Sequence, residues 1–306
     1  MLDWLAVLAQ TCRTLLACCL LALAGCTTAD LPLLGKPAAH IDGGHDISRS
    51  EYQTRLDLYR SLNQKQTALN GTQQAVPGST QGHSDELQLE DKAVGDLVNE
   101  ELMREQAATM RLTVSEKEVD QQVTFLQQAL TSSPTGPTTL TQFLHTYGYT
   151  MQLLRNQLRA RLVQVKVENK LALERAQKAY EVLHSGAQFA DVARKYSDDR
   201  SSAAKGGEID MTPKDLALVD SALRPIIDFL QPGATGNGPV RAQSGFFVLR
   251  LLARDPSGVK VLVIYTYGPD AQHFRENNVP QWFKDYVSGL QKQAHVRYYV
   301  GSRAEA

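Results

Sequence analysis

Tyr196-Ser-Asp-Asp-Arg-Ser-Ser-Ala-Ala-Lys-Gly-Gly-Glu-Ile-Asp210 is the stretch that decides the fold of this 306-residue chain. Its first half is polar, and Gly206-Gly207 is typical of a backbone turn with positive φ angles. A phosphate-binding loop is excluded, because the P-loop spacing and its lysine are absent. The glycine pair therefore predicts a structured turn rather than a phosphate-binding loop.

The segments on both sides of this turn have helical or strand patterns. Upstream, apolar spacing predicts a helix over residues 172–184, ended by Gly186, and a short helix over residues 189–196. Downstream, the sequence predicts one helix and three strands: the helix over 218–230, a hairpin from Gly238 to Leu252 with its turn at Ser244-Gly245, and a further strand over 259–265.

The first half of the chain is predicted to be helical. Capping boxes at Ser48–Glu51 and Ser115–Glu118 each start a helix. Residues 63–84 are rich in Gln, Thr, Gly and Ser and predict a flexible loop. The other predicted helices cover residues 85–111, 140–147, 151–167 and 280–293, and a closing strand covers 295–300. Four cations on the helix over 151–167 are interpreted as a solvated face: Arg155, Arg159, Arg161 and Lys166.

Composition excludes several classes of protein. The chain has 32 basic and 33 acidic side chains, a net charge of −1 and 42% hydrophobic residues. A nucleic-acid-binding surface needs a basic excess, and a disordered chain has few apolar residues and a high net charge. The sequence therefore favours a globular protein with no nucleic-acid partner, and nothing in it indicates a metal or an organic cofactor.

All four cysteines lie in the first 26 residues, which excludes a disulfide framework, a cysteine metal site and a thiol nucleophile from the rest of the chain. An apolar run of 12 residues, Thr14–Gly25, is followed by Cys26, which gives the tetrapeptide Leu23-Ala24-Gly25-Cys26. The run is short for a membrane span and typical of a signal peptide, and the tetrapeptide matches the bacterial lipobox. We expect cleavage before Cys26 and lipidation of its sulfur; the alternatives are a plain signal peptide or an uncleaved anchor.

Several motifs in order carry a resemblance to a known family. They are Ala187-Gln-Phe-Ala190 with Tyr196-Ser197, Ser201-Ser-Ala-Ala-Lys-Gly-Gly207, Leu230-Gln-Pro-Gly233, Gly238-Pro-Val240 and Ser244-Gly-Phe246. With them, the segment resembles the parvulin-type peptidyl-prolyl isomerase domain. The segments Ile47–Tyr52, Ala93–Leu102 and Leu112–Val119 resemble the helical chaperone module of SurA and PrsA proteins.

The resemblance implies an α+β fold, in which a discontinuous, mostly helical SurA/PrsA-like module contains an inserted parvulin-like domain with a small antiparallel sheet. The implied organisation is a lipoprotein signal peptide (1–25), a tether (26–40), the helical module (41–170), the parvulin-like domain (171–258) and a strand plus helix that completes the helical module (259–306).

The resemblance also implies a site. Asp199 falls at the family's Cys or Asp position and is the candidate catalytic residue. Val219 and Leu223 fall in the proline pocket. Phe247 stands where the family has its second histidine and is a third candidate for holding the proline ring. The strand that carries the first histidine is absent before residue 171.

Neither family histidine is therefore present, and the vacant strand has two candidate replacements. Residues 163–167 could form a degenerate strand, unless the helix that begins at Met151 continues through them. Alternatively, Val259–Val263 fills the vacant place from the C-terminal side. The seven histidines stand at other positions: 40, 45, 83, 145, 184, 273 and 295.

These expectations lead to three hypotheses of function. The first is a prolyl isomerase and chaperone, lipid-anchored outside the cytoplasm of a bacterium, that acts on X-Pro segments of unfolded or partly folded secreted polypeptides. The second is a holdase that has lost isomerase activity. The third is a structural envelope lipoprotein. For Asp199 the alternative to catalysis is a polar loop residue that is solvated or bonded to nearby backbone amides.

Overall fold

The computed structural model describes residues 35–69, 78–132, 136–268 and 279–304. The chain divides into two units, Met1–Pro37 and Ala38–Ala306, and every helix and strand described below lies in the second. The predicted signal peptide and Cys26 lie outside the described residues. Among the helices that the structure describes, none combines the length and apolar character that a membrane crossing requires.

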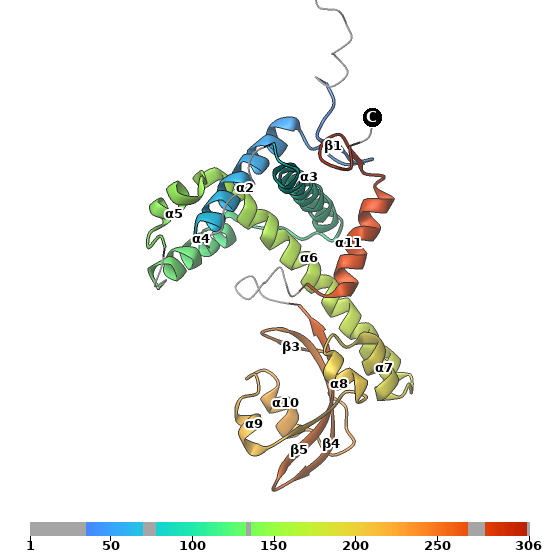
Figure 1. Cartoon of the computed structure of the whole chain (residues 1–306). Coiled ribbons are helices and arrows are strands. Elements are labelled where there is room, and N and C mark those ends of the chain that lie inside the picture. The colour runs from blue at the N-terminus through green and yellow to red at the C-terminus, as the bar shows by residue number, and fades with distance from the viewer. Residues whose placement is uncertain (1–34, 70–77, 133–135, 269–278, 305–306) are drawn as a thin grey trace, which may run out of the picture. The chain divides into compact units, whose positions relative to one another are not determined.

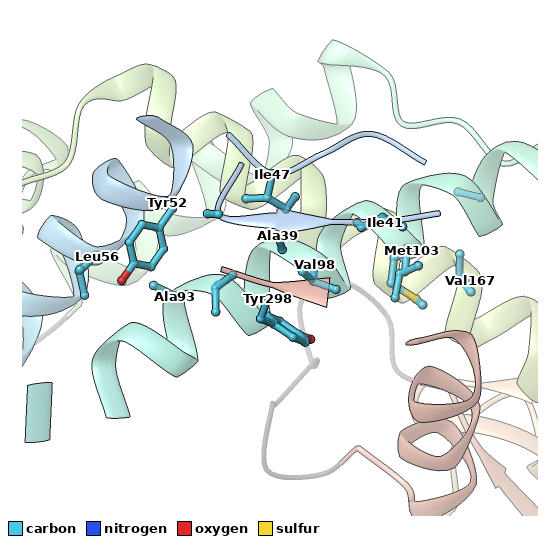
Figure 2. Close-up of a cluster of buried hydrophobic side chains, with 14 of the residues drawn as sticks. Ala39, Ile41, Ile47, Tyr52, Leu56, Ala93, Val98, Met103, Val167 and Tyr298 are labelled. Atoms are coloured by element: carbon cyan, nitrogen blue, oxygen red, sulfur yellow. The ribbon is translucent and has the colours of Figure 1, made fainter. Parts of the chain in front are cut away.

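The first half of the second unit is helical, as expected. It contains β1 (Ala39–His40), α2 (Arg49–Leu69), α3 (Thr80–Thr109), α4 (Glu116–Thr131), α5 (Leu140–Tyr147) and α6 (Met151–His184). Val94, Val98 and Leu102 recur at four-residue spacing on α3 and are all buried in one apolar core. Figure 2 shows part of this core around Ala39 of β1.

The C-terminal segment packs against this same core. α11 (Gln281–Gln293) contributes Phe283, which is 1% exposed, and Tyr286, whose hydroxyl donates to Gln106 of α3 at 2.8 Å. β6 (Arg297–Tyr298) pairs with β1 in an antiparallel two-stranded sheet, with Tyr298 opposite Ala39 (Figure 2). The helical module is therefore discontinuous in sequence.

Helix α6 is continuous over 34 residues. The proposal of a strand at residues 163–167 is wrong, and its alternative, a helix that runs through, is correct. Val167 is fully buried in the core of the helical module. Further along the helix, three alanines are buried against the second half of the structure: Ala172, Ala176 and Ala179. These small side chains let the helix lie close to the sheet described next.

The second sheet has four antiparallel strands in the order β2-β5-β4-β3. The strands are β2 (Glu208–Met211), β3 (Val240–Ala242), β4 (Gly245–Asp255) and β5 (Gly258–Tyr267). β5 lies in the interior of the sheet, so the predicted replacement from the C-terminal side is observed. The expected boundary at residue 258 is wrong, because it cuts the β4–β5 hairpin; residues 259–267 belong to this sheet.

Helices cover both faces of the sheet (Figure 1). The end of α6 and α7 (Phe189–Tyr196) pack on one face, around Val248 and Ile264. α9 (Pro213–Ala217) and α10 (Arg224–Phe229) pack on the opposite face, around Leu249 and Val263. We call the latter the α10 face. The alternation of side chains along each strand separates the two sets.

Two other sequence predictions need correction. Residues 63–69 and 80–84, expected in a loop, belong to α2 and α3; Ser79 caps α3 by accepting from the Gly82 amide at 3.1 Å. The helix expected over 218–230 is shorter: only α10, Arg224–Phe229, is helical, and before it the Asp220 carboxylate accepts from the amides of Ala222 and Gln243. Good helix-forming residues outweighed the polar composition in the first case, and local bonds to a side chain replace the start of the helix in the second.

The cations of α6 are not simply solvated. Arg155 pairs with Glu116 and Asp120 at 2.8 and 2.6 Å, and Lys166 pairs with Glu118 at 2.5 Å. The Lys166 ammonium is the largest cause that holds the pKa of Glu118 low, at about 2. These pairs join the start of α4 to α6.

Gly207 supplies a test of the sheet packing. Its φ is +87°, and a Cβ there would lie 2.6 Å from the Val263 carbonyl oxygen of β5. Gly186 has a comparable φ of +101° with nothing within 4 Å of a Cβ. Because both substitutions strain the backbone but only one creates a clash, we expect Gly207→Ala to reduce the free energy of unfolding by about 1–3 kcal/mol more than Gly186→Ala. Denaturant unfolding measures the difference; equal losses would contradict the described packing of β5.

Candidate functional site

The predicted pocket residues come together on the α10 face. Val219, Leu223 and Phe247 belong to one apolar cluster, in which Leu223 is buried and the other two are half-buried. The segment between α9 and α10 supplies Val219 and Leu223, the latter being the N-cap of α10, and β4 supplies Phe247. The partial exposure of two members leaves apolar surface available to a ligand.

Tyr265 of β5 is a member of this site that the sequence did not indicate. It stands directly across from Phe247 in the strand register, and their ring centroids are 4.8 Å apart. Its hydroxyl donates to the Ser244 carbonyl oxygen at 2.8 Å. Burial is the main cause that raises the pKa of Tyr265 to about 12, so the hydroxyl keeps its proton at neutral pH. We refer to Val219, Leu223, Phe247 and Tyr265 as the site cluster.

A shift in strand register puts Tyr265 in this place. At the hairpin end Asp255 pairs with Gly258, but between Leu251 and Ala253 the register shifts by one residue. With the register of the hairpin end, Phe247 would face Thr266 instead. Because neighbouring residues point to opposite faces, the shift decides that an aromatic ring from β5 joins the site cluster. Thr266 points to the other face, where its hydroxyl donates to the Ala172 carbonyl at 3.2 Å.

Asp199 lies at the start of the short helix α8 (Arg200–Ala204) and caps it. Its carboxylate accepts from the backbone amides of Ser201 and Ser202 at 3.1 and 3.3 Å. This bonding agrees with the polar-loop alternative, since the carboxylate already has local partners. The catalytic role of Asp199 stays a prediction.

The adjacent residue, Asp198, makes the longer-range contacts. Its carboxylate accepts from the backbone amide of Tyr267 at 2.8 Å and from the indole N–H of Trp282 at 3.0 Å. Its own amide donates to the Tyr265 carbonyl at 2.6 Å, while the hydroxyl of Ser197 accepts from the Tyr265 amide at 3.1 Å. Ser197 and Asp198 therefore continue the edge of β5 and hold Tyr265 in position. Burial raises the pKa of Asp198.

No histidine takes part in these contacts among the described residues. His40 pairs with Asp46 at 2.6 Å, and His184 stacks on Tyr180; His273 lies outside the described residues. Within the part of the chain that the structure describes, no group of three or more potential ligands could hold a metal ion. The site cluster offers a ligand an apolar, partly dehydrated surface with two aromatic rings and a neutral hydroxyl.

The capping role of Asp199 is testable by substitution. Asp199→Ala removes the acceptor for two amides and is expected to reduce the free energy of unfolding by about 1 kcal/mol. Asp199→Asn keeps an acceptor and should retain most of the stability. Thermal unfolding of both variants checks this, and an Asp199→Ala variant as stable as the unchanged chain would contradict the capping role.

Comparison with known proteins agrees with the two-part fold. The family model described as SurA-like N-terminal domain matches residues 1–168, and that described as PPIC-type PPIase domain matches residues 157–253. A search of curated protein sequences gives no match.

One similar solved structure is the 1.70 Å crystal structure of peptidylprolyl isomerase (PrsA) from Bacillus anthracis. Its identity is 16%, it covers 66% of this chain and 97% of that chain, and its TM-score is 0.24. These values are too low to transfer a function. The first family model, however, spans more than half of the chain. The chain therefore belongs to the family with a SurA-like N-terminal domain, and it carries a PPIC-type peptidyl-prolyl isomerase domain.

Proposed function

We propose that this chain is a folding factor anchored by lipid outside the cytoplasm, and that its isomerase domain binds X-Pro segments of unfolded secreted polypeptides and accelerates their isomerisation. The observation that carries the proposal is the gathering of Val219, Leu223, Phe247 and Tyr265 on one sheet face. A proline ring is apolar and flat enough to pack on such a surface.

Prolyl isomerisation requires no covalent chemistry from the site. Rotation about an X-Pro bond meets a barrier of about 18–20 kcal/mol, and no bond to a protein atom has to form. Transfer of the amide from water to an apolar surface reduces its charge-separated, double-bonded character. Each reduction of the barrier by about 1.4 kcal/mol gives a tenfold faster rotation. A site without histidine can supply this effect, because it depends on the exclusion of water and on the fit of the ring.

The sequence supports the proposed location. Leu23-Ala24-Gly25-Cys26 provides the lipidation motif. The tether expected over 26–40 ends earlier than that, because Ala38 and Ala39 are buried in the core of the helical module, where β1 begins. Two or more acyl chains at Cys26 would make the attachment stable. The helical module would then hold unfolded clients near the membrane.

A second candidate function is a holdase without isomerase activity. Two observations favour it: Phe247 stands where the resemblance implies a histidine, and the carboxylate of Asp199 is engaged by backbone amides. In this case the site cluster would bind proline segments but would not accelerate rotation.

Isomerisation of a short X-Pro peptide by the 27–306 chain tests the proposal. We expect a rate above that of buffer, and we expect Phe247→Leu to reduce it about five- to tenfold because the ring face is lost. Phe246→Leu is the matched control: Phe246 is the preceding residue, but it packs against Ala172 and Ala176 on the opposite face. A rate equal to buffer, with aggregation of an unfolded client still suppressed, would favour the holdase. Loss of both activities would contradict both functions.

A further inference from the structure

Glu168 is an unusual residue in the middle of α6. Its side chain is fully buried, and neither carboxyl oxygen has a hydrogen-bond partner among the described residues. Its neighbour Val167 packs in the core of the helical module, and Ala172, one turn further, packs with Phe246 and Trp282. Glu168 therefore lies where the helical module meets the isomerase domain, at a position where an apolar residue would be expected.

The surroundings of Glu168 include a second carboxyl group, the partly buried Asp198, whose charge acts on Glu168. Asp198 has the two donors described above, from Tyr267 and Trp282, whereas the described residues offer Glu168 none. Two nearby carboxylates in a buried site cannot both ionise at low cost. Because Asp198 holds the donors, Glu168 is the group that keeps the proton.

The other charged and titratable groups face Asp198. Arg175 lies on α6 itself and Arg200 on α8, and both act on the charge of Asp198. From β5, the backbone amide of Tyr267 donates to Asp198, and the charge of Asp198 acts on the phenol of Tyr265. From α11 the facing group is Trp282, which does not titrate and which also packs under the guanidinium of Arg175 at 5.8 Å.

We propose that Glu168 is a proton-binding site that couples α11 to the isomerase domain: with the proton bound the joint of Glu168, Asp198 and Trp282 is closed, and loss of the proton releases Trp282. An ionised Glu168 has to be hydrated, and the joint has to open for water to reach it. The contact that yields is a side-chain one, Trp282 to Asp198, since Tyr267 is held by the backbone pairing of β5.

The sign of the pH dependence follows from the geometry. Burial, with the Asp198 charge as a smaller cause, raises the pKa of Glu168 from 4.5 to about 8. The folded chain therefore binds a proton that the unfolded chain has lost over this range. The stability that this site contributes is fully present below about pH 4.5 and is lost as the pH rises toward 8.

Trp282 itself reports on the joint. The chain has two tryptophans, and the other is Trp4, so Trp282 is the sole tryptophan of the 27–306 chain. We expect its fluorescence to change in one step between pH 6 and 9, with a red shift and a midpoint near pH 8. Glu168→Gln keeps the shape but cannot ionise, and it should remove the step and also the decline of the melting temperature between about pH 4.5 and 8.

Glu174→Gln is the matched control, because Glu174 lies on the same helix, is half exposed and pairs with Lys170 at 3.2 Å. It should keep the step unchanged. Far-ultraviolet circular dichroism verifies that each variant folds, and Glu168→Met serves as a second non-ionising variant. No step in the unchanged chain, or the same step after Glu168 is replaced, would overturn the proposal. The readout requires no isomerase activity, so it stands apart from the test of the proposed function.

Discussion

The pairing of β5 with β4 is the constraint on which the rest of the structure depends. β5 is bonded on both sides, to β4 along its length and to β2 near its start. Its alternate residues enter two separate cores, with Val261 and Val263 on the α10 face and Ile264 toward α6 and α7. An isomerase domain that lacks a strand before its first helix would expose unpaired backbone groups, and β5 removes that exposure.

The same strand connects the site to the helical module. Ser197 and Asp198 extend the bonded edge of β5 at Tyr265 and Tyr267, and Asp198 in turn accepts from Trp282 of α11. The buried alanines of α6 and the bond from Thr266 to Ala172 fix the other face of the sheet. The position of Tyr265 in the site cluster is therefore linked, through Asp198, to the helix that returns to complete the helical module.

The sequence predicted the helices and strands of the fold better than the contacts between them. Motifs around Tyr196 and Gly206 predicted the isomerase-like domain, and the β-branched residues of 259–265 predicted a strand that fills the vacant place. It could not find Tyr265, because the one-residue shift near Leu252 leaves no signal in the residue types and reverses which side chain faces Phe247. The alternating valines of Val163–Val167 suggested a strand, but these residues lie in the long helix α6, where Val163 and Val167 pack in the core of the helical module. From the sequence, Glu168 and Asp198 are ordinary polar residues; only the fold shows that Glu168 is buried and Asp198 partly buried.

The register of β5 against β4 is the central claim, and a cysteine cross-link tests it most directly. The Gly268 amide bonds to the Ser244 carbonyl, so by alternation Phe247 and Tyr265 form a pair without mutual backbone bonds, with Cα atoms about 4.5 Å apart, which suits a disulfide. The 27–306 chain has no cysteine of its own. Under mild oxidation the Phe247→Cys/Tyr265→Cys chain is predicted to form an intramolecular disulfide, seen as a faster band on a non-reducing gel, while Phe247→Cys/Thr266→Cys is not. A cross-link in the second chain and none in the first would contradict the register and the site built on it.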